Sequence, residues 1–190
     1  MAIETINTTT HYVTIKNYNR GNLFYELADY QYCLSRIGLY AHQYGLLLHA
    51  YVLMPNHMYL LLTAARTTII ITALEMFELD YGEYFNFYYR RVRKLLELDI
   101  SMLPVDADQH LLMYCRYIEL APVRSRLIQH PADYHWSSYG CNAMGEDTGM
   151  LTLHEKYLAL GVDEQTRRSS YRGLFEENGP ADLSGQRAVA

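Results

Sequence analysis

Residues 49–63 read His-Ala-Tyr-Val-Leu-Met-Pro-Asn-His-Met-Tyr-Leu-Leu-Leu-Thr, and the remaining segments can be arranged around this stretch. Two apolar runs flank the pair Pro55-Asn56, in which proline fixes its own φ and asparagine tolerates a tight backbone. The pattern predicts a β-hairpin. Because side chains alternate between the two faces of a strand, we expect His57 and Tyr59 to project from the same face of the sheet.

The spacing of apolar residues predicts the other elements. Strands are expected at 11–15, 46–54 and 58–63, and helices at 28–44, 73–94 and 108–120. We expect the β-branched run 67–72 to delay the second helix, Gly45 to end the first and Pro122 to end the third. This order favours an α+β fold in which an antiparallel sheet has its helices packed on one face.

Length and composition indicate one folded domain with a tail. The chain has 190 residues, of which 50% are hydrophobic and 19% charged, and this balance is typical of a globular protein rather than a disordered one. We expect a domain over 1–145 and a helical C-terminal tail over 146–190. The tail should hold two short helices, near 157–161 and 167–175, and should fray from Asn178 onward.

The net charge of −5 argues against a surface coated for general DNA binding, because Lys and Arg contacts with phosphates supply most nonspecific affinity. Any nucleic-acid interface must therefore be local. Cys33, Cys115 and Cys141 are too few and too widely spaced for a disulfide framework or a zinc site. With no basic-then-apolar leader and no apolar run of about 20 residues, we expect a cytoplasmic protein without a membrane span.

One dense basic cluster follows a tyrosine-rich segment that contains Tyr84, Tyr88 and Tyr89. Its cations are Arg90, Arg91, Arg93 and Lys94. Charges for phosphates interleaved with rings for bases are typical of nucleic-acid binding, and a solvated basic helix end is the alternative. Arg20 and Lys16 lie in an expected loop and are open to the same two interpretations. The 19 tyrosines fit either stacking on bases or a half-buried sheet and helix surface.

Several motifs, taken in order, resemble the REP-associated tyrosine transposases, which belong to the single-tyrosine HUH transposases of insertion-sequence type. The segments that carry the resemblance are Arg20-Gly-Asn, Met54-Pro-Asn-His-Met-Tyr, residues 80–91, Arg116-Tyr-Ile-Glu-Leu-Ala-Pro-Val, Pro131-Ala-Asp-Tyr and Trp136-Ser-Ser-Tyr. The resemblance extends over nearly the whole chain from His11. It implies a ferredoxin- or RRM-like HUH fold and a DNA transposase that acts on single-stranded or hairpin DNA.

The resemblance also implies roles for individual residues. Tyr117 falls at the nucleophile, which forms a 5′-phosphotyrosyl intermediate, and His57 falls at the first ligand of a divalent metal, Mg²⁺ or Mn²⁺. The other two ligand positions hold Tyr59 and Ala121, and neither a neutral phenol nor a methyl group binds such a cation well. Without the flanking motifs, His57 would be interpreted as a partly buried strand residue and Tyr117 as a packing residue of its helix.

Two functions therefore remain open. One is an active transposase, with a divalent metal cofactor, that nicks and rejoins single-stranded or hairpin DNA through Tyr117. The other is a catalytically inactive relative that binds nucleic-acid hairpins or a protein partner and needs no cofactor. Residues 95–104 stand where the resembling family has a Gly-Thr-Leu-Trp-x-Gly-Arg loop, and this departure weakens the case for DNA contact. The sequence leaves a homodimer open.

Overall fold

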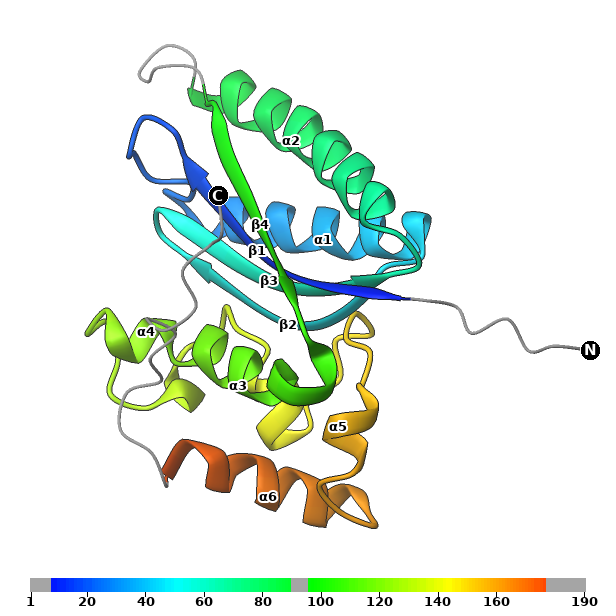
Figure 1. Cartoon of the computed structure of the whole chain (residues 1–190). Helices are drawn as coiled ribbons and strands as arrows, with labels where there is room; N and C mark the ends of the chain where they lie inside the picture. Colours follow the sequence, from blue (N-terminus) through cyan, green and yellow to red (C-terminus); the bar gives the residue numbers. More distant parts are fainter. Residues whose placement is uncertain (1–7, 90–95, 177–190) are drawn as a thin grey trace, which may run out of the picture.

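The computed structural model describes residues 8–89 and 96–176, and Figure 1 shows their arrangement. The strands are β1 (Thr9–Asn17), β2 (Leu47–Met54), β3 (His57–Ala64) and β4 (Leu98–Val105). The helices are α1 (Leu27–Tyr44), α2 (Thr67–Tyr89), α3 (Ala107–Glu119), α4 (Ala121–Arg124), α5 (Glu155–Leu158) and α6 (Glu164–Glu176). The frayed end expected from Asn178 lies outside the described residues. None of the described helices is long and apolar enough to cross a membrane.

The four strands form one antiparallel sheet in the order β2-β3-β1-β4, which confirms the predicted α+β class. The Pro55-Asn56 turn joins β2 to β3 and sets Met54 opposite His57, so the predicted hairpin is confirmed. β4 is a strand that the sequence analysis does not predict. It pairs with β1 at the edge of the sheet, where Pro104 is tolerated because an edge strand can lack one N–H donor.

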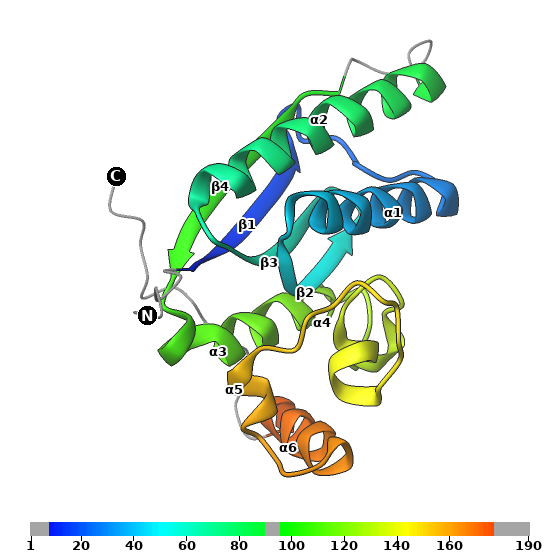
Figure 2. The same ribbon diagram turned by 90° about the vertical axis from the view of Figure 1, so that its right-hand side faces the viewer.

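Helices cover both faces of the sheet, whereas the sequence analysis placed them on one face (Figures 1 and 2). α1 and α2 pack on the first face, where Met58 and Leu60 are buried. On the second face α3 packs against β2 and β3, over Val52 and Leu61. The physical reason lies in β2 and β3, whose side chains are apolar and buried in nearly every position, so that both faces need a cover.

The observed helix boundaries follow local chemistry with one correction. Gly45 ends α1 as predicted, in a left-handed conformation with φ of 62° that glycine adopts without strain. α2 begins at Thr67 and not at the predicted residue 73. Ile70 is fully buried in the layer between α2 and the sheet, and this packing outweighs the weak helix preference of the β-branched residues.

Tyrosine hydroxyl groups tie α1 to α2. The carboxylate of Asp29 in α1 is almost fully buried and accepts hydrogen bonds from the hydroxyl groups of Tyr84, at 2.8 Å, and Tyr89, at 2.9 Å. Asp80 in α2 likewise accepts from Tyr32 in α1, at 2.5 Å. These tyrosines form part of a half-buried helix surface, as one of the two interpretations of the sequence expected. Their rings contact other aromatic rings, and their hydroxyl groups donate to carboxylates within the fold.

The segment that follows α4 protects the outer edge of β2. The backbone N–H of Leu53 donates to the carbonyl of Trp136 at 2.9 Å, and the N–H of Ser138 donates to the carbonyl of Tyr51 at 2.9 Å. The indole ring of Trp136 stacks on Tyr30 of α1, with 4.9 Å between ring centroids. The Trp-Ser-Ser-Tyr motif therefore closes one edge of the sheet, which would otherwise expose unpaired backbone groups.

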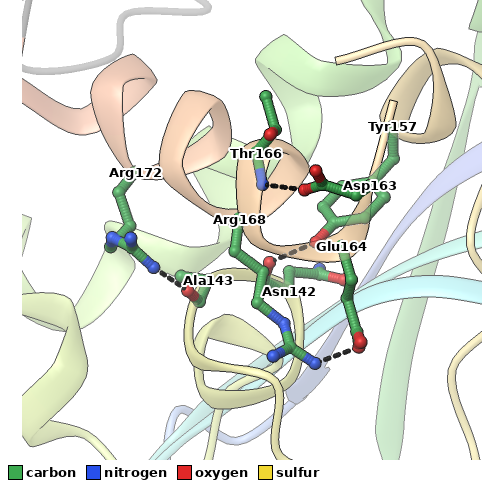
Figure 3. Close-up of polar contacts among 8 residues, drawn as sticks. All are labelled: Asn142, Ala143, Tyr157, Asp163, Glu164, Thr166, Arg168 and Arg172. Atoms are coloured by element: carbon green, nitrogen blue, oxygen red, sulfur yellow. Dashed lines mark hydrogen bonds and ion pairs between the residues drawn. The ribbon is translucent and has the colours of Figure 1, made fainter. Parts of the chain in front are cut away.

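The two short helices predicted for the tail are present as α5 and α6, and Figure 3 shows how they are attached. The hydroxyl group of Tyr157 in α5 donates to the carbonyl of Asn142 at 2.6 Å, and Arg172 in α6 donates to the carbonyl of Ala143 at 2.6 Å. Both carbonyls belong to a single π-helical turn, Gly140–Met144. The tail thus docks on the segment that closes the β2 edge.

A buried carboxyl group at the end of α3 joins three segments. Glu119 is fully buried, and its Oε1 accepts from Ser138 Oγ at 2.6 Å and from Asn142 Nδ2 at 2.8 Å, while its Oε2 accepts from the hydroxyl group of Tyr171 in α6 at 2.8 Å. Burial raises the pKa of Glu119 to about 7, although all three hydrogen bonds act in the opposite direction. The motif segments 116–123 and 136–139 are therefore held together by the hydrogen bond between Glu119 and Ser138.

Candidate nucleic-acid interface

Four tyrosine rings from three elements meet on the sheet face that α3 covers. We call Tyr12 of β1, Tyr59 of β3, and Tyr114 and Tyr117 of α3 the tyrosine cluster. Between ring centroids, Tyr12 lies 5.4 Å from Tyr59, 5.3 Å from Tyr114 and 6.1 Å from Tyr117, and Tyr59 lies 6.2 Å from Tyr117. Tyr12, Tyr59 and Tyr117 are partly exposed, so the cluster reaches the surface beside α3. The structure therefore brings two of the sequence-predicted site residues, Tyr59 and Tyr117, together.

His57 lies beside the cluster at the beginning of β3. Its ring centroid is 4.7 Å from that of Tyr59, and its Nδ1 is 2.8 Å from Oδ1 of Asn56. Burial, followed by the positive charges of Lys16 and Arg124, lowers the pKa of His57 to about 4. The imidazole is therefore neutral at pH 7.

Two cations accompany His57. Lys16 is exposed and stands directly opposite His57 in the pairing of β1 with β3, with Asp99 of β4 on its other side. Arg124 at the end of α4 places its guanidinium carbon 3.8 Å from the centroid of the Tyr117 ring and donates from Nη1 to the Tyr117 carbonyl at 2.5 Å. Within residues 8–89 and 96–176, Arg124 has no carboxylate at ion-pair distance.

The three expected ligand positions do not fit a divalent metal. His57 could offer one nitrogen, because Asn56 contacts the other and orients the ring. Burial is the main cause that raises the pKa of Tyr59, so its phenol stays protonated and is a poor ligand. Ala121 opens α4, and its methyl group is buried in the apolar layer between α3 and the sheet. In the part of the chain that the structure describes, no three His, Cys, Asp or Glu side chains are grouped so as to hold a metal ion.

The other sequence-predicted nucleic-acid residues are only partly described. Arg90, Arg91, Arg93 and Lys94 lie outside the described residues. Arg20 is exposed in the turn after β1, with a φ of 58°. Of the tyrosines before the basic cluster, Tyr84 and Tyr89 are committed to Asp29, whereas Tyr88 is 64% exposed. Tyr88 is therefore the ring of this group that solvent, or a base, can reach.

Sequence reasoning missed Tyr12 and did not assign Arg124 a role. Tyr12 is two residues from Thr14 and four from Lys16 on a strand, so alternation places all three on one face. Only the register of β1 against β3, which sets Lys16 opposite His57, shows that this face is the one that carries His57 and Tyr59. A search for aromatic residues at alternate strand positions could have found Tyr12. Lys16, which was expected in a loop, lies within β1 because its backbone pairs with β3 and β4.

No protein-family model matches the chain, and no curated protein matches its sequence. Among solved structures, the chain is similar to a REP-associated tyrosine transposase bound to a REP hairpin, with a TM-score of 0.55 and 15% identity over 76% of this chain and 82% of that one. It is also similar to a candidate transposase from Deinococcus radiodurans R1, with a TM-score of 0.40 and 16% identity over 60% of this chain and 92% of that one. The second likeness is too distant to carry an argument. The first shows that this chain shares the fold of a tyrosine transposase.

Proposed function

We propose that this protein binds single-stranded or hairpin DNA on the face that carries the tyrosine cluster, and that it binds this DNA without cutting it. The observation that carries the proposal is the meeting of four aromatic rings with two cations, Lys16 and Arg124, on one partly exposed face. Rings stack on unpaired bases and cations hold phosphates, which is the combination that single-strand binding requires.

The shared fold supports the proposal. The structurally similar REP-associated tyrosine transposase was solved with a REP hairpin bound, and its fold matches most of this chain. Unpaired bases at hairpin loops and ends offer free faces for stacking, whereas paired bases within a duplex do not. A preference for hairpins or single strands over plain duplex DNA is therefore expected.

The chemistry of the site argues for binding rather than strand cleavage. A phenol is a poor nucleophile at pH 7, and the resembling family activates its tyrosine beside a divalent metal. In this chain two of the three ligand positions, Tyr59 and Ala121, offer a protonated phenol and a buried methyl group. When bound, Mg²⁺ or Mn²⁺ would polarise the scissile phosphate, and His57 would be its single conventional side-chain ligand among these positions.

The test measures binding and cleavage on the same DNA. Fluorescence anisotropy with a labelled hairpin should show binding that is weaker for a blunt duplex of equal length. Replacing Tyr117 by leucine should weaken hairpin binding by about tenfold, the lower end of the loss expected for one stacked base. Tyr117→Phe, which keeps the ring, should leave binding unchanged. Tyr44→Leu, a half-buried ring on the opposite side of the sheet, is the matched control.

The cleavage arm decides between the two functions left open by the sequence. Incubation of the protein with labelled hairpin and Mn²⁺, followed by denaturing electrophoresis, should show no covalent adduct. An adduct that disappears in Tyr117→Phe would establish the active transposase instead. Absence of hairpin binding by the unmodified protein would reject DNA as the partner.

A further inference from the structure

Lys16 and Arg124, the two cations beside His57, indicate how the protein would hold a DNA phosphate, and this inference rests on the proposed DNA-binding function. Arg124 is half-buried, with its guanidinium group over the Tyr117 ring and one nitrogen bonded to the Tyr117 carbonyl. A guanidinium group carries five N–H donors, and this hydrogen bond uses one of them. The remaining donors are available to an anion.

The guanidinium group is held in place before any ligand arrives. The cation–π contact at 3.8 Å and the hydrogen bond at 2.5 Å restrain both the plane and the position of the Arg124 head group. A restrained fork loses little side-chain entropy when it binds, and its planar geometry matches two oxygens of one phosphate. These properties suit Arg124 for a bidentate phosphate contact rather than for a loose surface charge.

Two positive charges flank His57. Lys16 stands opposite His57 in the pairing of β1 with β3, and Arg124 lies over the ring of Tyr117 in the adjacent tyrosine cluster. Asp99, opposite Lys16 in the sheet, is exposed on β4, where solvent screens its charge. With only His57 as a conventional metal ligand, these two cations favour a phosphodiester anion over a divalent cation at this place.

We propose that Arg124 and Lys16 together bind one phosphate of the DNA backbone beside His57, so that the protein holds DNA through its own cations and without a divalent metal. Arg124 supplies the fixed, bidentate contact and Lys16 supplies a mobile charge from the adjacent strand. The base next to this phosphate then lies against Tyr117 or Tyr59. The site is an anion site at the place where the sequence resemblance predicts a metal site.

The test uses the full-length protein and the labelled hairpin, titrated at several salt concentrations with EDTA present and again with Mn²⁺. Removing one cation that binds a phosphate should reduce the slope of log K against log salt by about 0.7 to 0.9. Arg124→Met and Lys16→Met should each show this reduction and weaken binding by about tenfold or more at low salt. Arg66→Met removes an exposed cation at the opposite end of the sheet and is the matched control.

The outcomes separate the inference from the function on which it rests. EDTA should change the dissociation constant by less than about twofold, because the protein's own cations bind the phosphate. If the unmodified protein binds the hairpin but both variants keep its salt slope, or if binding requires Mn²⁺, the inference is overturned and the DNA-binding function stands. No hairpin binding by the unmodified protein overturns both. Lys16 is exposed on the surface, so Lys16→Met tests the inference even if Arg124→Met fails to fold.

Discussion

Replacing Glu119 by glutamine should make the stability of this protein less dependent on pH. The fully buried carboxyl group has a pKa of about 7 in the folded protein, compared with an ordinary value of 4.5. The folded state therefore retains a proton that the unfolded state releases between these two pH values. The stabilising contribution of the protonated group is fully present below pH 4.5 and is lost as the pH rises towards 7.

The size of the effect follows from the interval between the two values. At about 1.4 kcal/mol for each pH unit, ionised Glu119 costs the folded state about 3 kcal/mol above pH 7. Glutamine does not titrate. Its amide oxygen can accept from Ser138 and Asn142 as Oε1 does now, and its NH₂ group can donate to the Tyr171 oxygen, so the three connections are kept.

Urea unfolding at pH 5, 6, 7 and 8, followed by circular dichroism, measures the effect. The free energy of unfolding of the unmodified protein, minus that of Glu119→Gln, should fall by about 2 to 3 kcal/mol between pH 5 and pH 8. Other groups such as His49, whose pKa burial lowers to about 4, titrate in both proteins and cancel in the difference. Glu75→Gln, which makes the same replacement at an exposed position of α2, is the matched control. A flat difference for Glu119→Gln would refute the reasoning.

Two further predictions concern the backbone and the ligand positions. Gly45→Ala should lower the free energy of unfolding by about 1 kcal/mol, measured by urea unfolding. The residue has a φ of 62° and an added Cβ would meet no neighbour, so the cost comes from the backbone conformation alone. As a control, Gly82→Ala within α2 also adds a Cβ that meets no neighbour, and it should be neutral or stabilising. Ala121→Asn with Tyr59→His should create Mn²⁺ binding detectable by calorimetry, together with a loss of about 1 to 3 kcal/mol in unfolding free energy, since the new amide replaces a buried methyl group. Metal binding equal to that of the unmodified protein would contradict the second prediction.

The features that could be predicted are those determined by residues close together in the sequence. The Pro55-Asn56 turn and the end of the first helix at Gly45 depend on the backbone preferences of these few residues, and both predictions are confirmed. β4 could not be predicted in the same way, because its strand conformation depends on pairing with β1 and its sequence includes Pro104. The position of α3 on the second face is likewise a property of tertiary packing.

In the candidate site, too, the sequence predicted some residues, while others depend on tertiary structure. The sequence identified His57, Tyr59 and Tyr117 through a motif, and the structure places the Tyr59 ring near both of the others. The approach of Lys16 to His57 depends on strand register, and the contact of Arg124 with Tyr117 depends on the break between α3 and α4. Neither could be derived from residue spacing.

Photo-crosslinking tests most directly the claim that DNA lies on the tyrosine cluster. A hairpin that carries 5-iodouracil in its loop is irradiated with the protein, and the modified peptides are identified by mass spectrometry after trypsin digestion. Cleavage after Arg116 and Arg124 releases residues 117–124, and cleavage after Arg36 and Arg66 releases residues 37–66, which contain Tyr59. Cleavage after Lys16 releases the N-terminal peptide that contains Tyr12. The account predicts adducts on Tyr117, Tyr59 or Tyr12 that disappear when unlabelled hairpin competes. Competable adducts confined to residues outside the tyrosine cluster would contradict it.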